Sequence, residues 1–158
     1  MSFEKENFLR TRLVSYLQRL DPSTPPKWGK MTVQQMIEHY TSDGLLIASG
    51  KANVKEIITP PERLARYREF MMSDRAFQEN TVNPLLEADP VPVQHKTVQG
   101  AIGSLQQELI IFFDVFEKDP ALMTRNTIFG DLNFDENVQL LYKHALHHLR
   151  QFGIDVNI

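Results

Sequence analysis

The sequence contains no cysteine. This absence excludes a disulfide framework, an iron–sulfur cluster, a thiolate zinc site and a cysteine nucleophile. The chain nevertheless has 158 residues, and a domain of this size buries roughly 68–70% of the surface that its unfolded form exposes. Its core therefore needs neither a disulfide nor a structural metal. We expect any metal bound by this chain to serve function rather than folding.

The sequence also lacks a basic run and a long apolar run. Its formal net charge is -3, and no stretch concentrates the lysines and arginines that neutralise phosphates. The longest apolar run, Leu109 to Phe113, is too short to span a bilayer. The sequence starts with acids and no apolar stretch, unlike a signal or transit peptide. We expect a single domain over residues 1–158 that is soluble and cytoplasmic, with no nucleic-acid partner and no membrane partner.

Apolar residues recur at helical spacing in four long segments, with almost no alternating strand pattern. The four segments cover residues of about 4–20, 32–48, 97–118 and 134–152. Between the second and third lies a proline-rich crossover, residues 50–96, in which only PERLARYREFMM is typical of a helix. Short connections make neighbouring helices antiparallel, whereas a long crossover lets the chain return in parallel. The pattern predicts an all-α fold, an up-down-down-up four-helix bundle with a long crossover that contains a short extra helix.

Three of the five histidines lie close together in the last helical segment, at His144, His147 and His148. At about 100° per residue, the apolar stripe of this segment lies about 60° from His148 and about 100° from His144. His147 lies about 160° from the stripe, so we expect it to face solvent. His144 and His148 have the i, i+4 spacing that lets two imidazoles reach one divalent ion. Taken alone, such a pair is more often a hydrogen-bonded surface feature, so a metal site requires a third ligand.

The third ligand has to come from another part of the chain, where the remaining histidines are His39 and His95. His39 lies about 110° from the centre of the apolar stripe of its helix, a position at the bundle seam like that of His144. His95 lies in the proline-rich crossover, and a histidine on a helix is held more rigidly than one in a loop. We therefore favour His39 as the third ligand and retain His95 as the alternative.

Three polar residues share the flank of this candidate site by helical angle: Asp43, Asn137 and Gln151. Each could orient an imidazole without itself binding the metal, and Asp43, one turn after His39, could instead act as a base. The alternative interpretation is an asparagine close to a helix N-cap and two solvated side chains. The sequence contains neither His-Glu-x-x-His nor Gly-x-Ser-x-Gly, so it supports neither a zincin protease nor a serine hydrolase. The pattern assigns no catalytic residue.

Several short motifs resemble those of the DinB-like (YfiT-like) superfamily, closest to a branch of uncharacterised proteins. The motifs are Trp28-Gly29-Lys30-Met31-Thr32 followed by Gln35-Met36-Ile37-Glu38-His39, then Phe129-Gly130-Asp131-Leu132, and then His144-Ala145-Leu146-His147-His148-Leu149-Arg150-Gln151-Phe152-Gly153. The resemblance implies an up-down-down-up four-helix bundle with one metal ligand on the second helix and a His-x-x-x-His pair on the last. Carried over residue by residue, these ligands are His39, His144 and His148.

The resemblance also implies a divalent transition metal, which could be Zn, Ni, Mn or Fe, and a small-molecule substrate. Some members of the superfamily are enzymes of low-molecular-weight thiols, including bacillithiol transferases and a mycothiol-dependent isomerase. A site with three histidines keeps a position open for water or substrate. One hypothesis is therefore a metal-dependent enzyme, either an S-transferase that uses a low-molecular-weight thiol or a hydrolase that uses metal-activated water. The alternative is a non-enzymatic metal or small-ligand binding module that acts as a homodimer.

Overall fold

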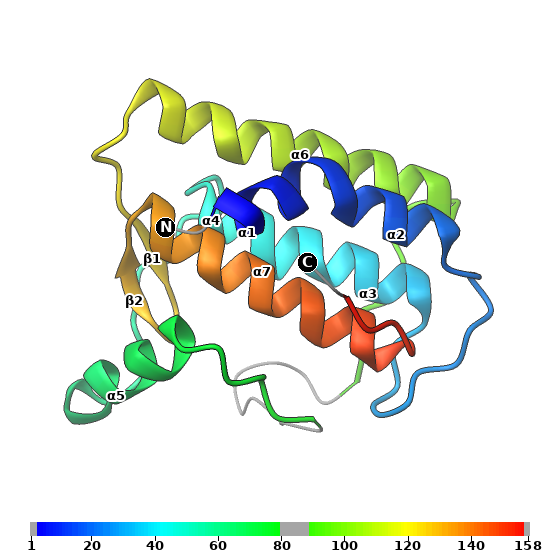
Figure 1. Ribbon diagram of the computed structural model, residues 1–158, viewed down its shortest axis with the longest axis horizontal. Helices are drawn as coiled ribbons and strands as arrows, with labels where there is room; N and C mark the ends of the chain where they lie inside the picture. Colours follow the sequence, from blue (N-terminus) through cyan, green and yellow to red (C-terminus); the bar gives the residue numbers. More distant parts are fainter. Residues whose placement is uncertain (1–2, 80–88, 157–158) are drawn as a thin grey trace.

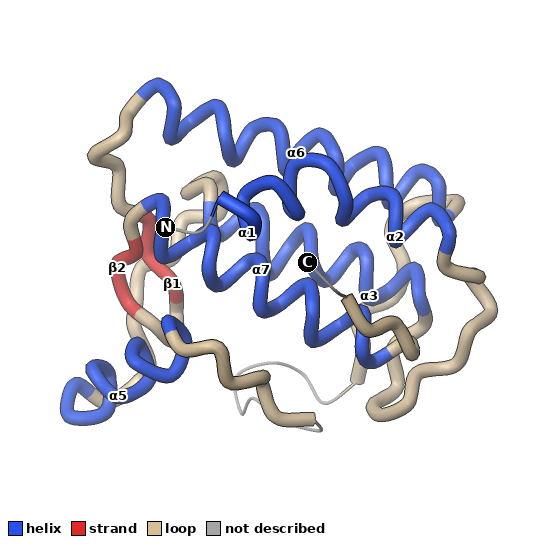
Figure 2. The backbone as a smooth tube through the Cα atoms, viewed as in Figure 1, coloured by secondary structure: helices blue, strands red, loops and turns tan. Residues whose placement is uncertain are grey.

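The computed structural model describes residues 3–79 and 89–156, and it is mostly helical (Figure 2). The first long segment runs through α1 (Phe3–Asn7), a π-helical turn η1 (Phe8–Arg12) and α2 (Leu13–Arg19). The second runs through α3 (Val33–His39), a π-helical turn η2 (Tyr40–Leu45) and α4 (Leu46–Ala48). The third and fourth long segments are α6 (Val98–Lys118) and α7 (Phe134–Gln151). These bounds confirm the helices expected from the sequence.

Two capping boxes fix where the second and fourth segments begin. Thr32 accepts from the backbone N–H of Gln35, whose side chain accepts from the backbone N–H of Thr32. Asn133 and Glu136 make the same reciprocal pair at the start of α7. Each box satisfies backbone donors that the first turn of a helix leaves without partners. The two capping boxes therefore fix the residues at which α3 and α7 begin, and with them the faces on which the histidines of these helices lie.

The four long segments lie side by side and share one apolar core (Figure 1). An apolar stripe on α6 is buried throughout, and this helix contacts α2 and α3. Its buried members are Ile102, Leu105, Leu109, Phe112, Phe113 and Phe116. No helix of residues 3–79 and 89–156 is long and apolar enough to cross a membrane.

The crossover contains the expected extra helix, α5 (Pro61–Met72), which lies against α7. Two side chains of α7 hold its C-terminal end, where helix carbonyls have no partners of their own. The Gln139 amide donates to the carbonyls of Met71 and Ser73. The Lys143 ammonium donates to those of Phe70 and Ser73 at 2.8 and 3.1 Å. Residues 80–88 of the predicted crossover lie outside the described residues.

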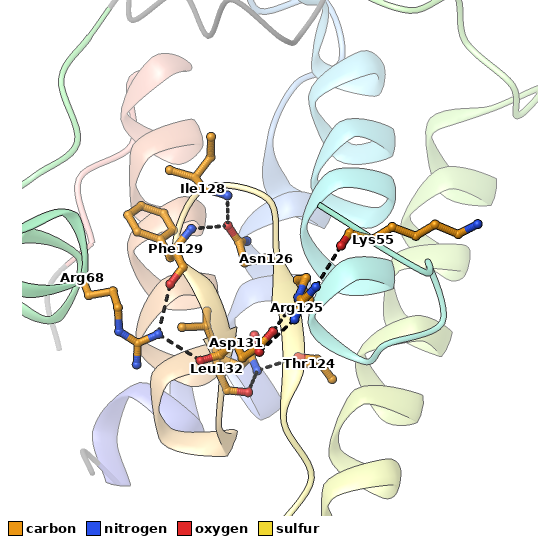
Figure 3. Close-up of polar contacts among 10 residues, drawn as sticks. Lys55, Arg68, Thr124, Arg125, Asn126, Ile128, Phe129, Asp131 and Leu132 are labelled. Atoms are coloured by element: carbon orange, nitrogen blue, oxygen red, sulfur yellow. Dashed lines mark hydrogen bonds and ion pairs between the residues drawn. The ribbon is translucent and has the colours of Figure 1, made fainter. Parts of the chain in front are cut away.

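A β-hairpin that the sequence analysis did not predict precedes α7. Its strands, β1 (Thr124–Asn126) and β2 (Gly130–Leu132), pair antiparallel with Asn126 opposite Gly130. Arg68 of α5 donates to the carbonyls of Phe129 and Asp131, while Arg125 pairs with the Asp131 carboxylate (Figure 3). The Arg68 bonds fasten the hairpin to α5. The Arg125–Asp131 pair joins the two strands to each other.

Asn137 of α7 contacts this hairpin and none of the three candidate histidines. The hypothesis that Asn137 orients an imidazole is therefore wrong. The side-chain amide of Asn137 is buried and donates to the Thr124 hydroxyl and to the carbonyls of Leu132 and Asn133. The Thr124 hydroxyl in turn donates to the carbonyl of Ala48. Asn137 therefore ties α7 to β1 and, through Thr124, to the end of α4.

Candidate metal centre

Three histidine side chains from two helices converge at one point of the seam between α3 and α7. The Nε2 atom of His144 lies 3.1 Å from Nε2 of His39 and 2.9 Å from Nε2 of His148. The ligand atoms of all three lie within 4.8 Å of one another. The structure thus brings together the three residues that the spacing and the resemblance selected.

His95, the alternative third ligand, lies outside this group. Its Nδ1 atom is 3.5 Å from the Glu38 carboxylate. The backbone N–H groups of Gln94 and His95 also donate to Glu38, and the Gln34 amide donates to the carbonyl of His95. This network fastens the end of the crossover to α3, so the position of His95 has a structural explanation.

Two polar side chains hold the outer nitrogens of the cluster. His39 Nδ1 lies 2.8 Å from Oδ2 of Asp43, and His148 Nδ1 lies 2.8 Å from Oε1 of Gln151. The Gln151 amide nitrogen donates to the carbonyl of Trp28 at 2.9 Å, which orients its oxygen toward His148. Metal-binding histidines commonly donate their second ring N–H to a carboxylate or carbonyl in this way. Of the two interpretations given for Asp43 and Gln151, these contacts favour the one in which each side chain orients an imidazole.

These contacts decide which ring nitrogens carry protons. A carboxylate only accepts hydrogen bonds, and the Gln151 oxygen also accepts, so Nδ1 is the donor in both His39 and His148. In the neutral ring the proton on Nδ1 leaves a lone pair on Nε2. Two lone pairs therefore face His144 Nε2, which can donate a proton to only one of them. The cluster holds more acceptors than donors, and a cation at its centre would satisfy this excess.

Burial keeps His144 and His148 neutral. Loss of hydration lowers the pKa of His148 to about 3, with the neighbouring His39 adding to the shift. The same cause, reinforced by His148 and His39, lowers the pKa of His144 well below its usual range. A histidine coordinates a metal only when neutral, and near pH 7 both rings are in that form.

A glycine makes room for the central imidazole. A Cβ atom added at Gly44 would lie only 3.3 Å from Nδ1 of His144. The ring also lies close to Tyr40, whose ring centre is 5.1 Å away. Tyr40 is itself fixed by a hydrogen bond of 2.8 Å from its hydroxyl to the carbonyl of Leu141. Gly44 was not identified from the sequence as part of this site, because a missing side chain gives no chemical signal of its own.

His147 does not face solvent, contrary to the expectation from helical angle. Its ring lies 5.4 Å from the ring of Trp28 and 6.3 Å from that of Phe77. Burial, reinforced by the charge of Arg150, lowers its pKa. The connector that contains Trp28 folds back on the end of α7, where the backbone N–H of Lys27 donates to the carbonyl of Gln151. Helical periodicity describes one helix alone, so it does not predict that a connector covers the face on which His147 lies.

The donor set fits a divalent transition metal. Nitrogens bound to tetrahedral zinc at about 2.0–2.1 Å lie roughly 3.3 Å apart. The observed separations of 2.9 and 3.1 Å differ from this by only a few tenths of an ångström. Imidazole ligands suit zinc, iron and nickel better than manganese, which prefers oxygen ligands. The residues present therefore fit a divalent transition metal.

No protein-family model, curated protein or solved structure matches this chain. The DinB-like resemblance therefore stays a hypothesis based on the motifs of the sequence.

Proposed function

We propose that this chain is a metal-dependent protein of the DinB-like superfamily in which His39, His144 and His148 bind one divalent transition metal. The observation that supports this most strongly is the convergence of three Nε2 atoms with two outer nitrogens held by Asp43 and Gln151. A surface pair of histidines would not need this arrangement, because exposed rings satisfy both nitrogens with water.

The proposal includes the topology of the fold, an up-down-down-up four-helix bundle. The course of the chain in Figure 1 supports it, since α3 and α6 start at one end of the long helices and α1 and α7 start at the other. The same order of directions is implied by the resemblance. It lets α3 and α7 run antiparallel, with their histidines at the same level.

We further propose that the centre is catalytic. Three protein ligands leave a position open, and the side chain of His39 is 21% exposed, so the cluster is not sealed from solvent. When bound, a metal of this kind supplies Lewis-acid chemistry toward water or a thiol. The chain's own residues present three imidazole nitrogens, and Asp43 and Gln151 accept from the outer Nδ1 atoms of His39 and His148. Because the chain has no cysteine, any reacting sulfur has to arrive on a small thiol.

The experiment is a turnover assay on metal-stripped protein with and without added zinc, nickel or iron. One arm supplies bacillithiol with an aromatic halide, and the other supplies an activated ester without a thiol. Metal-dependent turnover in the first arm supports an S-transferase, and turnover in the second supports a hydrolase. His144→Ala is the matched variant and should abolish either activity. Bound metal without turnover in both arms would contradict the catalytic proposal and favour the binding module.

A further inference from the structure

A small cavity of about 60 Å³ lies on another flank of α7. It is formed where Lys5 of α1 and the segment after α5 meet the helix, with Tyr142, Lys143 and Arg150 as part of its wall. Since a cavity needs only about 10–15 Å³ to hold one water molecule, this one has room for a small polyatomic group. A carboxylate or a single tetrahedral oxyanion is of this order of size.

The lining of this cavity is strongly positive, although the whole chain is negative. Four cationic side chains border it, Lys5, Arg75, Lys143 and Arg150, against the single carboxylate of Asp74. The side chain of Asp74 is 96% exposed and lies 3.4 Å from the Lys5 ammonium. An exposed pair at this distance is weak, and Arg75, Lys143 and Arg150 form no ion pair with Asp74 among the described residues.

Two of the four cations are already held in place by the fold. The Lys143 ammonium is buried and donates to the carbonyls of Phe70 and Ser73. The Lys5 ammonium donates to the Gln139 side chain at 2.7 Å. The Lys143 contacts use carbonyl oxygens, which orient its ammonium group without neutralising it. Positive charge is therefore fixed at the cavity wall.

Arg75 and Arg150 supply guanidinium N–H donors that could bind an anion. Within residues 3–79 and 89–156, neither Arg75 nor Arg150 has a carboxylate partner for its guanidinium group. Arg75 lies over the ring of Phe70, 5.0 Å from its centre, which keeps its side chain close to the cavity. A guanidinium carries five N–H donors in a planar fork that matches carboxylate and phosphate oxygens. The wall therefore combines fixed charge with free bidentate donors.

A second hollow, at the start of α7, has the opposite character. It measures about 470 Å³ and is lined by Glu6, Glu117 and Asp135 with Arg10 as its cation. Arg10 is paired there with Glu6 and Glu117 and lies 3.7 Å over the ring of Phe113. Size alone would favour that hollow, but its arginine already has partners.

We propose that the cavity between α1, α5 and α7 is an anion-binding site for an oxyanion group, either a carboxylate or a phosphate, held by the forks of Arg75 and Arg150. Lys5 and Lys143 supply the surrounding positive field. The site uses none of His39, His144 and His148, so it exists whether or not a metal binds there.

The test is isothermal titration calorimetry at neutral pH and low ionic strength, on protein stripped of metal and then freed of chelator, since chelators are themselves carboxylates. One arm uses inorganic phosphate and the other uses succinate, so that the two sources of an oxyanion are distinguished. Saturable binding of one ligand per chain is expected in at least one arm, and the tighter arm identifies the ligand class.

Arg150→Gln and Arg75→Gln should each weaken binding about tenfold, because each removes a charge-assisted contact. Arg66→Gln, on an exposed arginine of α5 that borders neither described cavity, is the matched control and should bind within twofold of the parent. Arg150→Lys keeps the charge without the fork and should bind more weakly than the parent but better than Arg150→Gln. No saturable binding in either arm, or equal weakening by Arg66→Gln, would overturn the proposal.

Discussion

The Nε2 atom of His39 lies 3.1 Å from Nε2 of His144, although 105 residues separate the two in the sequence. His39 ends α3 and is followed by η2, which packs against α7, so the approach of the two rings depends on how closely η2 and α7 meet. Gly44 allows this approach because a Cβ atom at its position would lie 3.3 Å from the His144 ring. The candidate centre therefore depends on a small residue as well as on its three histidines.

Gly44→Ala tests this dependence. The added methyl group should displace the His144 ring by a few tenths of an ångström and weaken zinc binding about tenfold, measured by competition with a chromophoric chelator. Gly103→Ala is the matched control, because a Cβ atom at Gly103 meets nothing within 4 Å. That variant should bind zinc like the parent and gain roughly 0.5–1 kcal/mol of stability from helix propensity. Equal zinc affinity in both variants would show that Gly44 has no such role.

Asp43→Asn tests how the outer nitrogen of His39 is held. The amide keeps the size of the side chain but removes the charge that polarises the imidazole, so zinc affinity should fall about 10-fold to 100-fold. The adjacent substitution Ser42→Ala serves as the control, since the Ser42 hydroxyl contacts only the backbone carbonyl of His39, at 3.4 Å. An affinity for Asp43→Asn equal to that of Ser42→Ala would mean that Asp43 is only a solvated carboxylate.

The neighbouring histidines His147 and His148 should behave differently when each is replaced by alanine. His148→Ala removes one of three nitrogens and should cost at least tenfold in zinc affinity, whereas His147 is not part of the cluster and its removal should leave binding within twofold. His147→Ala should instead change the fluorescence of Trp28, the only tryptophan of the chain, because their rings lie 5.4 Å apart. Loss of zinc binding in His147→Ala would contradict the assignment.

The stability of the metal-stripped protein should depend on pH through His148. Its folded-state pKa is lowered to about 3, against an ordinary value near 6.5. Between these values the unfolded chain binds a proton that the folded chain does not, so the free energy of unfolding falls as the pH falls below about 6.5. The contribution is up to about 1.4 kcal/mol per pH unit. Urea unfolding at pH 7, 6 and 5 should show a shallower slope for His148→Gln, and an unchanged slope would contradict the prediction.

The helices and the histidine cluster could be predicted because their signals are local. Thr32 with Gln35 and Asn133 with Glu136 start two helices at the expected places. The i, i+4 spacing then places His144 and His148 on one flank of α7. The third member, His39, required comparing positions on different helices, and the sequence left His95 open until the structure placed it beside Glu38.

The features that were missed depend on contacts between distant segments. The hairpin strands have three residues each, too few to show alternation, and they are stabilised by Arg68 and Asn137 from other elements. His147 was assigned to solvent because helical angle describes only the helix itself. The connector around Trp28 covers that face, and nothing in its composition shows where it packs.

The most direct test of the metal centre is the zinc, nickel and iron content of untagged protein after equilibrium dialysis against each ion, compared with a variant in which His39, His144 and His148 are all alanine. The parent should bind one ion per chain and the variant none at the same free concentration, with both equally helical by circular dichroism. A parent that binds no ion, or a variant that binds as well as the parent, would contradict the assignment of these three histidines as a metal centre.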